Sequence, residues 1–288
     1  MKQQLKRSLG KVLVTLLPQR AERVRQNEFS MSVGHRNPLN SLIRAGLADR
    51  LIAGNRLDEL SANHRQFWAT DQGTEYHVHA RQHVTDSYHD YFSYVTDILR
   101  ELLAANPSID TIVEVGCGGG SLLDLLAQQL PEVKRLIGID LSPAIIAENK
   151  QMFDEPRLEW VVANGKTWVE QEGGSNTIYL SYRGVYEYFT EADLDEMFGK
   201  ISAEKAPSIS VSIEPIGLTH NLDADQSSQL YGSEFTFSHN YPHLYEKNGF
   251  TFHSVTRNEF DTHAICAVVA SVGLREPATR GLESPRYM

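Results

Sequence analysis

The sequence predicts an α/β protein in which a mostly parallel, seven-stranded sheet with an antiparallel last strand follows an N-terminal helical cap. From residue 111 onward, apolar runs rich in β-branched residues alternate with helical patterns. This order is typical of a parallel sheet that is covered on both faces through right-handed crossovers. The last two apolar runs, 250–255 and 264–272, have no helical pattern between them. They are therefore expected to pair as a hairpin, which makes the final strand antiparallel.

Composition limits the class of protein. The chain has 288 residues, of which 41% are hydrophobic and 22% charged, enough for one large domain or for a domain with an appended segment. Its two cysteines give no support to a disulfide framework and fit a cytoplasmic location. The longest apolar run near the start, Val12–Leu17, is too short to span a bilayer, so no transmembrane segment is expected. The net charge of −10 argues against nucleic acid as a partner.

The first 50 residues are basic, with ten Lys or Arg and three acids. An amphipathic helix is expected before Pro18, because aliphatic side chains recur at helical spacing among lysines and arginines. Its apolar positions are Leu5, Leu9, Val12, Leu13, Leu16 and Leu17. This face could pack on the protein's own domain or on a second subunit of a homodimer. It could also attach to an anionic membrane surface or contact a carrier protein.

The helical cap is expected over residues 1–108, which carry helical patterns and no long β-branched run. Within it we expect a loop at 34–40, an amphipathic stretch at 41–60 and an aromatic, His-rich stretch at 64–103.

The segment from Thr111 to Asp140 is the most informative part of the chain. A buried strand at 112–115 is expected to end in a glycine cluster, and glycine tolerates positive φ and lets a ligand lie against bare peptide. Leucines at helical spacing follow, so the free N–H groups of a helix start face the cleft. The next strand, 136–139, ends at Asp140, twenty positions after Gly120, where a carboxylate can accept hydrogen bonds from a ribose diol.

The spacing of the glycines distinguishes two cofactor classes. Gly116, Gly118 and Gly120 give GxGxG, whereas the dinucleotide fingerprint GxGxxG needs its third glycine at Ser121. The string VEVGCGGG at 113–120 resembles the first motif of the class I S-adenosylmethionine-dependent methyltransferases, and IGIDLSPAIIAENK at 137–150 resembles their second. The resemblance implies a Rossmann-like fold with S-adenosylmethionine as cofactor, and it leaves a nicotinamide oxidoreductase as the remaining alternative.

The alternation of elements continues beyond Asp140. Helices are expected at 143–153, 167–171, 191–201 and 241–248, and strands at 158–163, 177–180 and 209–213.

Domain boundaries follow from this alternation. The segment 216–237 has no clear helical period and is expected to be a substrate loop. The cofactor-binding domain is expected at 109–275, and residues 276–288, rich in Pro, Arg and Ser, are expected to be a loose tail.

The family resemblance also implies a set of cofactor contacts across the carboxyl ends of the strands. They are Glu114, Gly116, Gly118, Gly120, Asp140, Leu141, Asn164, Gly165 and Ser181, with Tyr76 and Arg81 from the cap. In this set Asp140 holds the ribose hydroxyls, and Leu141 packs on the adenine. Asn164 either accepts a hydrogen bond from the adenine amino group or serves as a turn former. Arg81 either pairs with the methionine carboxylate or is solvated.

The acceptor side is expected around YLSYRGVYEYF at 179–189, which places four tyrosines around Arg183 and Gly184. Aromatic rings suit a substrate wall beside a sulfonium, although a core strand entering a helix explains the same residues. The candidate substrate contacts are Tyr182, Arg183, Tyr186 and His243. Methyl transfer needs chiefly an aligned nucleophile, so a base is optional. The candidate bases are His239, Glu214 and His83, and no metal site is expected.

The favoured function is a methyltransferase that transfers a methyl group to a small-molecule acceptor, a metabolite or natural product, by in-line displacement. The helical cap argues for an enclosed acceptor site. Two alternatives remain open. One is methylation of a carrier-bound or macromolecular acceptor recognised by the basic N-terminal segment, and the other is a non-catalytic protein that binds S-adenosylmethionine.

Overall fold

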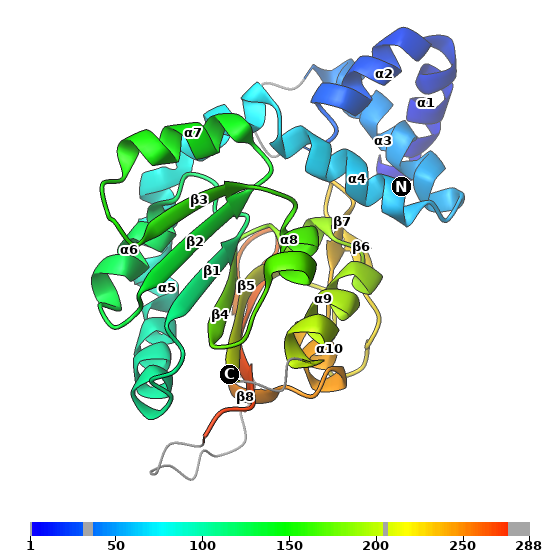
Figure 1. The fold of residues 1–288 in the computed structure, drawn as a ribbon. Helices are drawn as coiled ribbons and strands as arrows, with labels where there is room; N and C mark the ends of the chain where they lie inside the picture. The colour runs from blue at the N-terminus through cyan, green and yellow to red at the C-terminus, as the bar shows by residue number, and fades with distance from the viewer. Residues whose placement is uncertain (1, 31–36, 204–206, 276–288) are drawn as a thin grey trace.

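The computed structural model describes residues 2–30, 37–203 and 207–275, and it confirms the predicted α/β architecture (Figure 1). Seven strands form one sheet in the order β3-β2-β1-β4-β5-β9-β8. They are β1 (Thr111–Val115), β2 (Arg135–Asp140), β3 (Leu158–Val162), β4 (Thr177–Tyr182), β5 (Ser208–Ile216), β8 (Thr251–Glu259) and β9 (Ala264–Val272). Strands β1 to β5 are parallel, and β9 is antiparallel to both β5 and β8.

The order of the strands reverses between β1 and β4. The chain moves outward from β1 through β2 to β3 and then returns to place β4 on the other side of β1. In sheets of this type, crossovers on the two sides of such a point leave the sheet in opposite directions, and the carboxyl ends of the strands form a crevice there. The glycine turn follows β1, and Arg183 follows β4, so both open into this crevice.

Each face of the sheet has its own hydrophobic core because alternate residues of a strand point to opposite faces. Ile112 packs in one core with residues of three helices, and Val113 packs in the other with residues of three different helices. The first set is α5 (Asp71–Ala105), α6 (Ser121–Gln129) and α7 (Pro143–Met152); the second is α8 (Gly165–Glu172), α9 (Glu191–Ala203) and α10 (Tyr241–Lys247). Figure 1 shows the two sets on opposite sides of the sheet.

The predicted helical cap is present, with boundaries that differ from the expected ones. It consists of α1 (Lys2–Leu16), α2 (Pro18–Asn27), α3 (Pro38–Ala53), α4 (Leu57–Trp68) and the first half of α5. The stretch expected as one unit at 41–60 is broken between α3 and α4, where Asn55 adopts a positive φ of 52°. The expected loop at 34–40 is cut short by α3, and its residues 34–36 lie outside the described residues.

Helix α1 packs closely on α3 through glycine. A Cβ added to Gly10 would lie 2.1 Å from the Leu42 carbonyl oxygen and 2.6 Å from the Gly46 nitrogen, so only glycine allows the two helices to approach this closely. The opposite side of α1 is exposed, with Leu5, Leu9, Val12 and Leu16 between 48% and 68% accessible. The homodimer through the N-terminal helices stays a prediction.

The segment expected as an irregular substrate loop contains a short hairpin. Strands β6 (Gln229–Tyr231) and β7 (Thr236–Ser238) pair antiparallel between β5 and α10. Phe235 and Phe237 of this hairpin are buried against cap residues such as Phe29 and Leu60, and this packing connects the cap to the sheet domain.

The proposed domain limits at 108/109 and 275/276 stay predictions, and the tail 276–288 lies outside the described residues. Within the described residues, none of the helices combines the length and the apolar character needed to cross a membrane.

Candidate cofactor and acceptor site

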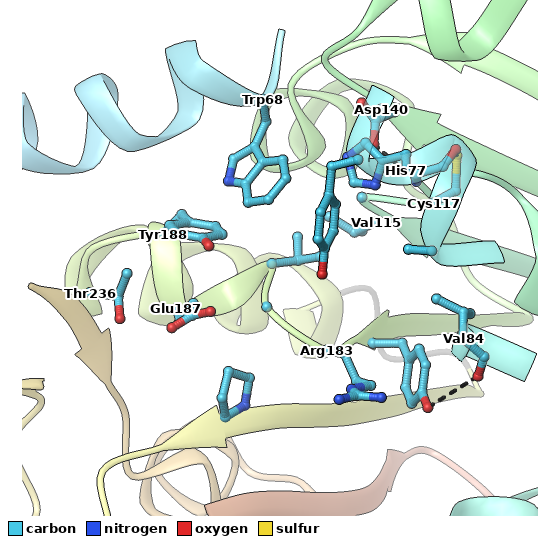
Figure 2. Close-up of a pocket in the computed structure, with 18 of the residues that line it drawn as sticks. Trp68, His77, Val84, Val115, Cys117, Asp140, Arg183, Glu187, Tyr188 and Thr236 are labelled. Atoms are coloured by element: carbon cyan, nitrogen blue, oxygen red, sulfur yellow. Dashed lines mark hydrogen bonds between the residues drawn. The ribbon is translucent and has the colours of Figure 1, made fainter. Parts of the chain in front are cut away.

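A cavity of about 700 Å³ lies at the carboxyl ends of β1 and β4 (Figure 2), within the size range of small-molecule sites. One half, here called the cofactor half, is lined by the glycine turn and by residues that follow β2 and β3. These residues are 114–119, 121, 139–141 and 163–165. The other half, here called the acceptor half, is lined by the cap, by the turn after β4, by the β6–β7 hairpin and by the β8–β9 turn. Its members include Trp68, His83, Arg183, Glu187, Tyr188, Tyr231 and His263.

The glycine turn has the conformation that the sequence predicted. Gly116 and Gly118 have φ values of 72° and 46°. Residues with a Cβ rarely adopt such values. The turn also has close neighbours on two sides. A Cβ on Gly116 would lie 2.6 Å from Val185, and a Cβ on Gly118 would lie 2.6 Å from Nδ1 of His77. The bare backbone is therefore required by packing as well as by conformation.

Asp140 fixes the shape of this turn. Its Oδ2 accepts a hydrogen bond from the Gly118 N–H at 3.0 Å, and its Oδ1 accepts one from the Ser142 N–H at 2.9 Å. A carboxylate oxygen has two lone pairs, so each can accept one further hydrogen bond. Asp140 lines the cavity, and its remaining acceptor capacity fits a ribose diol.

Glu114 is buried near the end of β1, and its Oε2 has no hydrogen-bond partner among the residues that the structure describes. Burial raises the pKa of this carboxyl well above its ordinary value, and the nearby charge of Asp140 adds to the effect. An unpartnered buried carboxyl oxygen is costly unless a ligand completes it. Glu114 lines the cavity, so it fits a cationic group such as the ammonium of an amino acid.

Arg81 lines the cavity but has partners within the protein. Its guanidinium donates to the Gly119 carbonyl oxygen at 3.0 Å, to Glu148 Oε1 at 3.1 Å and to Asn149 Oδ1 at 3.2 Å. The expectation that Arg81 is solvated is therefore wrong, because its side chain is largely buried among these partners. Its pairing with a ligand carboxylate stays a prediction, since two of the five N–H groups of the guanidinium are not used by these bonds. Arg81 fastens α5 to the glycine turn.

Three other predicted cofactor contacts have structural roles. Asn164 lines the cavity with Leu141 and Gly165, but its Oδ1 accepts from the Thr167 N–H at 3.2 Å and caps α8, which favours the turn-former interpretation. Gly120 lies outside the cavity lining and packs against Trp160 and Phe153. Ser181 is fully buried and donates to Glu214. The predicted contacts of Gly120 and Ser181 are therefore not supported by their positions.

Aromatic residues form much of the acceptor half. Trp68 lies 5.7 Å from Tyr188 and 5.5 Å from Tyr76, measured between ring centroids. Figure 2 shows Trp68 and Tyr188 on one side of the hollow and Arg183 on another. The predicted substrate contacts Tyr182 and Arg183 line the cavity, and so do the predicted cofactor contact Tyr76 and the candidate base His83. Tyr188 belongs to the stretch 179–189 that was expected to form a substrate wall. Trp68 was not predicted, since a lone Trp at the end of a helix carries no signal in one sequence.

Glu214, a predicted base, supports the turn after β4 instead. It is fully buried and absent from the cavity lining. Its Oε2 accepts hydrogen bonds from the backbone N–H groups of Gly184, Val185 and Tyr186 at 3.0–3.2 Å. Burial raises its pKa to about 7, although the hydrogen bonds that it accepts act in the opposite direction. The carboxyl therefore holds the segment that presents Arg183.

His239, the other predicted base outside the cap, is also structural. Its Nε2 lies 3.1 Å from the Tyr186 carbonyl oxygen and 3.2 Å from that of Phe189, and its Nδ1 lies 2.6 Å from Ser228 Oγ. Burial lowers its pKa to about 4. The prediction is wrong because the imidazole is enclosed by these partners and lies outside the cavity.

Tyr186 and His243 also lie outside the cavity lining. Tyr186 is a core residue, packed against Phe189, Phe198 and Tyr241. His243 lies in the first turn of α10, where its backbone N–H donates to Oδ1 of the capping residue Asn240. Neither is placed to contact an acceptor.

Glu187 is an acidic group of the acceptor half that the sequence did not reveal. It is buried beneath the aromatic wall, and its Oε2 accepts from the Tyr231 hydroxyl at 2.5 Å. Burial raises its pKa to about 8, against the effect of hydrogen bonds from Tyr231 and Thr236. At neutral pH this carboxyl is therefore largely protonated.

Comparison with known proteins agrees with this architecture. Residues 112–204 match the family model of a methyltransferase domain. Trans-aconitate 2-methyltransferase of Azoarcus sp. strain BH72 is 35% identical over 75 residues, and that of Escherichia coli O157:H7 is 38% identical over 74 residues. Each match covers 25% of this chain and only 28% of the relative's length.

Among solved structures, the magnesium protoporphyrin IX methyltransferase of Synechocystis PCC 6803 with bound S-adenosylmethionine is similar, with a TM-score of 0.50. The match covers 74% of this chain and 97% of that chain at 13% identity, and it indicates a shared fold. The strand order, the glycine turn and the family model agree. Residues 112–204 of the chain therefore match a methyltransferase domain in sequence, and the strand order around them agrees with that match.

Proposed function

We propose that the protein binds S-adenosylmethionine in the cofactor half and transfers its methyl group to a small-molecule acceptor in the acceptor half. One observation carries the proposal: Glu114, the bare glycine turn and Asp140 meet in one cavity at the strand-order reversal. A carboxyl oxygen without a partner, uncovered peptide and a carboxylate with spare acceptor capacity fit an ammonium group, an amino-acid backbone and a ribose.

The chemistry expected of this chain is mainly positioning. When bound, S-adenosylmethionine supplies a methyl group on a sulfonium whose leaving group is already activated. Glu114 holds the amino-acid end of the donor and Asp140 its ribose, and the cavity walls align the acceptor for in-line attack and exclude water. Arg183 and the aromatic wall face the place where the acceptor enters.

The enclosed shape supports a small acceptor over a macromolecular one. Trp68 and Tyr76 of the cap cover the acceptor half from one side, and the β6–β7 hairpin lines it from another. The similar trans-aconitate methyltransferases match only part of this chain, so they support the donor more than the acceptor. A carrier-bound acceptor is the second candidate, and the basic residues that accompany the exposed face of α1 favour it.

Calorimetric titration tests the donor. The wild-type protein is expected to bind S-adenosylmethionine and S-adenosylhomocysteine with micromolar dissociation constants and not to bind NAD. Asp140→Ala is expected to weaken S-adenosylhomocysteine binding roughly 10- to 100-fold, since hydrogen bonds to a charged group contribute about 1.5–3 kcal/mol each. Asp110→Ala is the matched control, because Asp110 pairs with Lys134 at the opposite end of the sheet. Binding of NAD alone, or equal affinities for both variants, would contradict the proposal.

A further inference from the structure

We propose that Arg183 binds a carboxylate of the acceptor, and that the acceptor is a carboxylic acid with an apolar, planar body that lies against Trp68, Tyr76 and Tyr188. This inference rests on the proposed function, because it concerns the acceptor half of the same cavity. The side chains that line this half indicate the chemical class of the acceptor. The carboxylate is an anchor for the acceptor in this proposal, whichever atom receives the methyl group.

Arg183 carries a positive charge, and its hydrogen-bond partners are not acids. Its Nη1 donates to Ser87 Oγ at 2.7 Å and lies 3.2 Å from Nε2 of His83, and it also makes a hydrogen bond with the Tyr182 hydroxyl. None of these three partners is a carboxylate. In the described part of the chain no carboxylate forms an ion pair with Arg183.

The acids nearby have other partners. Glu187, in the same half of the cavity, is held by Tyr231 and Thr236. Arg65, the other arginine of this half, already pairs with Asp193 at 3.3 Å. A half-buried guanidinium presents planar, paired N–H groups that match a carboxylate. Arg183 is therefore the group of this half suited to an incoming anion.

The backbone at Arg183 is held in a strained conformation. Its φ is 57°, a left-handed value that side chains other than Gly, Asn and Asp seldom adopt. Its own N–H donates to the Ile213 carbonyl oxygen at 2.7 Å, and Glu214 accepts from the three N–H groups that follow. A buried carboxyl and a strand end thus maintain the strain. The result is a guanidinium directed into the cavity from a turn with little freedom to move.

The surroundings of Arg183 favour an anion as well. His83 and His263 line the same end of the cavity. Burial lowers the pKa of His263, and the charge of Arg183 lowers it further, so this imidazole stays neutral and can donate a hydrogen bond. Arg183 thus supplies the permanent positive charge beside these two histidines, while the acid Glu234 also lines the cavity, and the chain as a whole has a net charge of −10.

One wall of the acceptor half is aromatic. Trp68, Tyr76 and Tyr188 form a continuous group, with ring centroids 5.5–5.7 Å apart along it. Tyr76 lies close enough to Arg183 for that charge to act on its hydroxyl. Aromatic walls recognise planar apolar surface through stacking and edge contacts. An acceptor with a carboxylate at Arg183 therefore extends its body along these rings.

Binding of probe acids tests the proposal. The probes are trans-cinnamate and indole-3-acetate, each compared with its primary amide, and the tricarboxylate trans-aconitate as a polar comparator. Affinities are measured by calorimetry with and without S-adenosylhomocysteine. The wild-type protein is expected to bind at least one of the two apolar acids at least ten times more tightly than its amide and more tightly than trans-aconitate.

The substitution Arg183→Asn removes the charge while keeping a residue that tolerates the left-handed conformation. It is expected to weaken binding of that acid roughly 10- to 100-fold, the loss expected for a charge-assisted hydrogen bond. Arg183→Lys is expected to retain part of the affinity, because a lysine keeps the charge but not the planar pair of donors. Arg135→Gln is the control, since it removes one positive charge at an ion pair with Glu159 remote from the cavity.

Three results would overturn the proposal: no binding of either apolar acid, amides that bind as well as acids, or equal affinities in wild type and Arg183→Asn. If Arg183→Asn does not fold, the comparison of wild type with Arg183→Lys and the acid–amide pairs decide. Binding of S-adenosylhomocysteine is a separate readout. Its absence contradicts the proposed function, whereas its presence together with a failed acid series contradicts only the assignment of Arg183.

Discussion

The two halves of the cavity are built in different ways. The cofactor half comes mostly from one continuous stretch, residues 111–140, and presents backbone and two carboxyl groups. The acceptor half combines side chains from α4, α5, the turn after β4, the β6–β7 hairpin and the β8–β9 turn, and it presents aromatic rings and Arg183. Substitutions in the first half should act on the ligand directly. Substitutions in the acceptor half should act both on the acceptor and on the stability of the segments that form this half.

The largest effect is expected for Glu214→Ala, which would test whether the acceptor half depends on its supports. Three backbone N–H groups would lose their buried acceptor, so the free energy of unfolding is expected to fall by about 3–5 kcal/mol. Urea denaturation measures this loss. Glu214→Gln keeps one acceptor oxygen and is expected to lose less. An unchanged urea midpoint for Glu214→Ala would contradict the supporting role.

Gly118→Ala tests the opposite half. The new Cβ would be placed 2.6 Å from His77 at a φ of 46°, and the left-handed conformation alone costs about 1–2 kcal/mol. S-adenosylhomocysteine affinity is expected to fall roughly 10- to 100-fold by calorimetry, while binding of apolar acids measured without the nucleotide stays unchanged. Gly174→Ala is the control, because nothing lies within 4 Å of its added Cβ. Equal losses of S-adenosylhomocysteine affinity and of apolar-acid affinity in Gly118→Ala would contradict the separation of the two halves.

The pH dependence of stability sharpens the comparison within the acceptor half. The pKa of Glu187 is about 8 in the folded protein and 4.5 in its reference state, so between these values the folded state binds more protons than the unfolded state. Stability from this group is complete below pH 4.5 and is lost as the pH rises toward 8. Glu187→Gln is expected to flatten the decline between pH 5.5 and 7 by up to about 1.4 kcal/mol per pH unit.

The measurement for Glu187 is the urea midpoint across that pH range. Glu172→Gln, at an exposed position of α8, is the control and should leave the slope as it is. A slope in Glu187→Gln that equals the wild-type slope would show that the carboxyl is ionised in the folded protein.

The smallest effects on stability and on cofactor affinity are expected for substitutions of Asn164. They test whether the cofactor half includes this residue. Because its side chain caps α8, Asn164→Ala is expected to lose about 1 kcal/mol of stability, and Asn164→Ser, which keeps a capping oxygen, much less. S-adenosylhomocysteine affinity in Asn164→Ser is expected to stay within about threefold of wild type, a change of less than 1 kcal/mol. A larger loss would restore the adenine contact and extend the cofactor half to this residue.

The sequence predicted the fold well because its signals are local. Alternating apolar runs and helical patterns produced the order of elements, including the antiparallel β9. Gly118 and Asp140 were recognisable from spacing, since a turn and the strand that follows it are close in the chain. Their contact, a hydrogen bond from the Gly118 N–H to the Asp140 carboxylate, joins positions only 22 residues apart.

The failures in the acceptor half have a common physical cause. His239 and Glu214 carry side chains suited to proton transfer, but their burial and partners depend on segments distant in the chain, such as the hydrogen bond from His239 to the Tyr186 carbonyl 53 residues away. Tyr186 and Tyr188 are two positions apart and have similar neighbours in the sequence. Tyr186 is nevertheless a core residue, whereas Tyr188 lines the cavity. Residue type alone cannot separate such pairs.

Helix α5 contributes to both halves of the cavity. Arg81 donates to the Gly119 carbonyl oxygen, and His77 packs on Gly118, while His83 and Ser87, farther along the same helix, contact Arg183. The second half of α5 is anchored in the core by Phe92 and Leu99. On the proposed function, the donor site and the acceptor site therefore share one helix, and calorimetry of each ligand with and without the other would measure any coupling between them. Whatever factor the donor applies to acceptor affinity, the acceptor must apply to donor affinity in return.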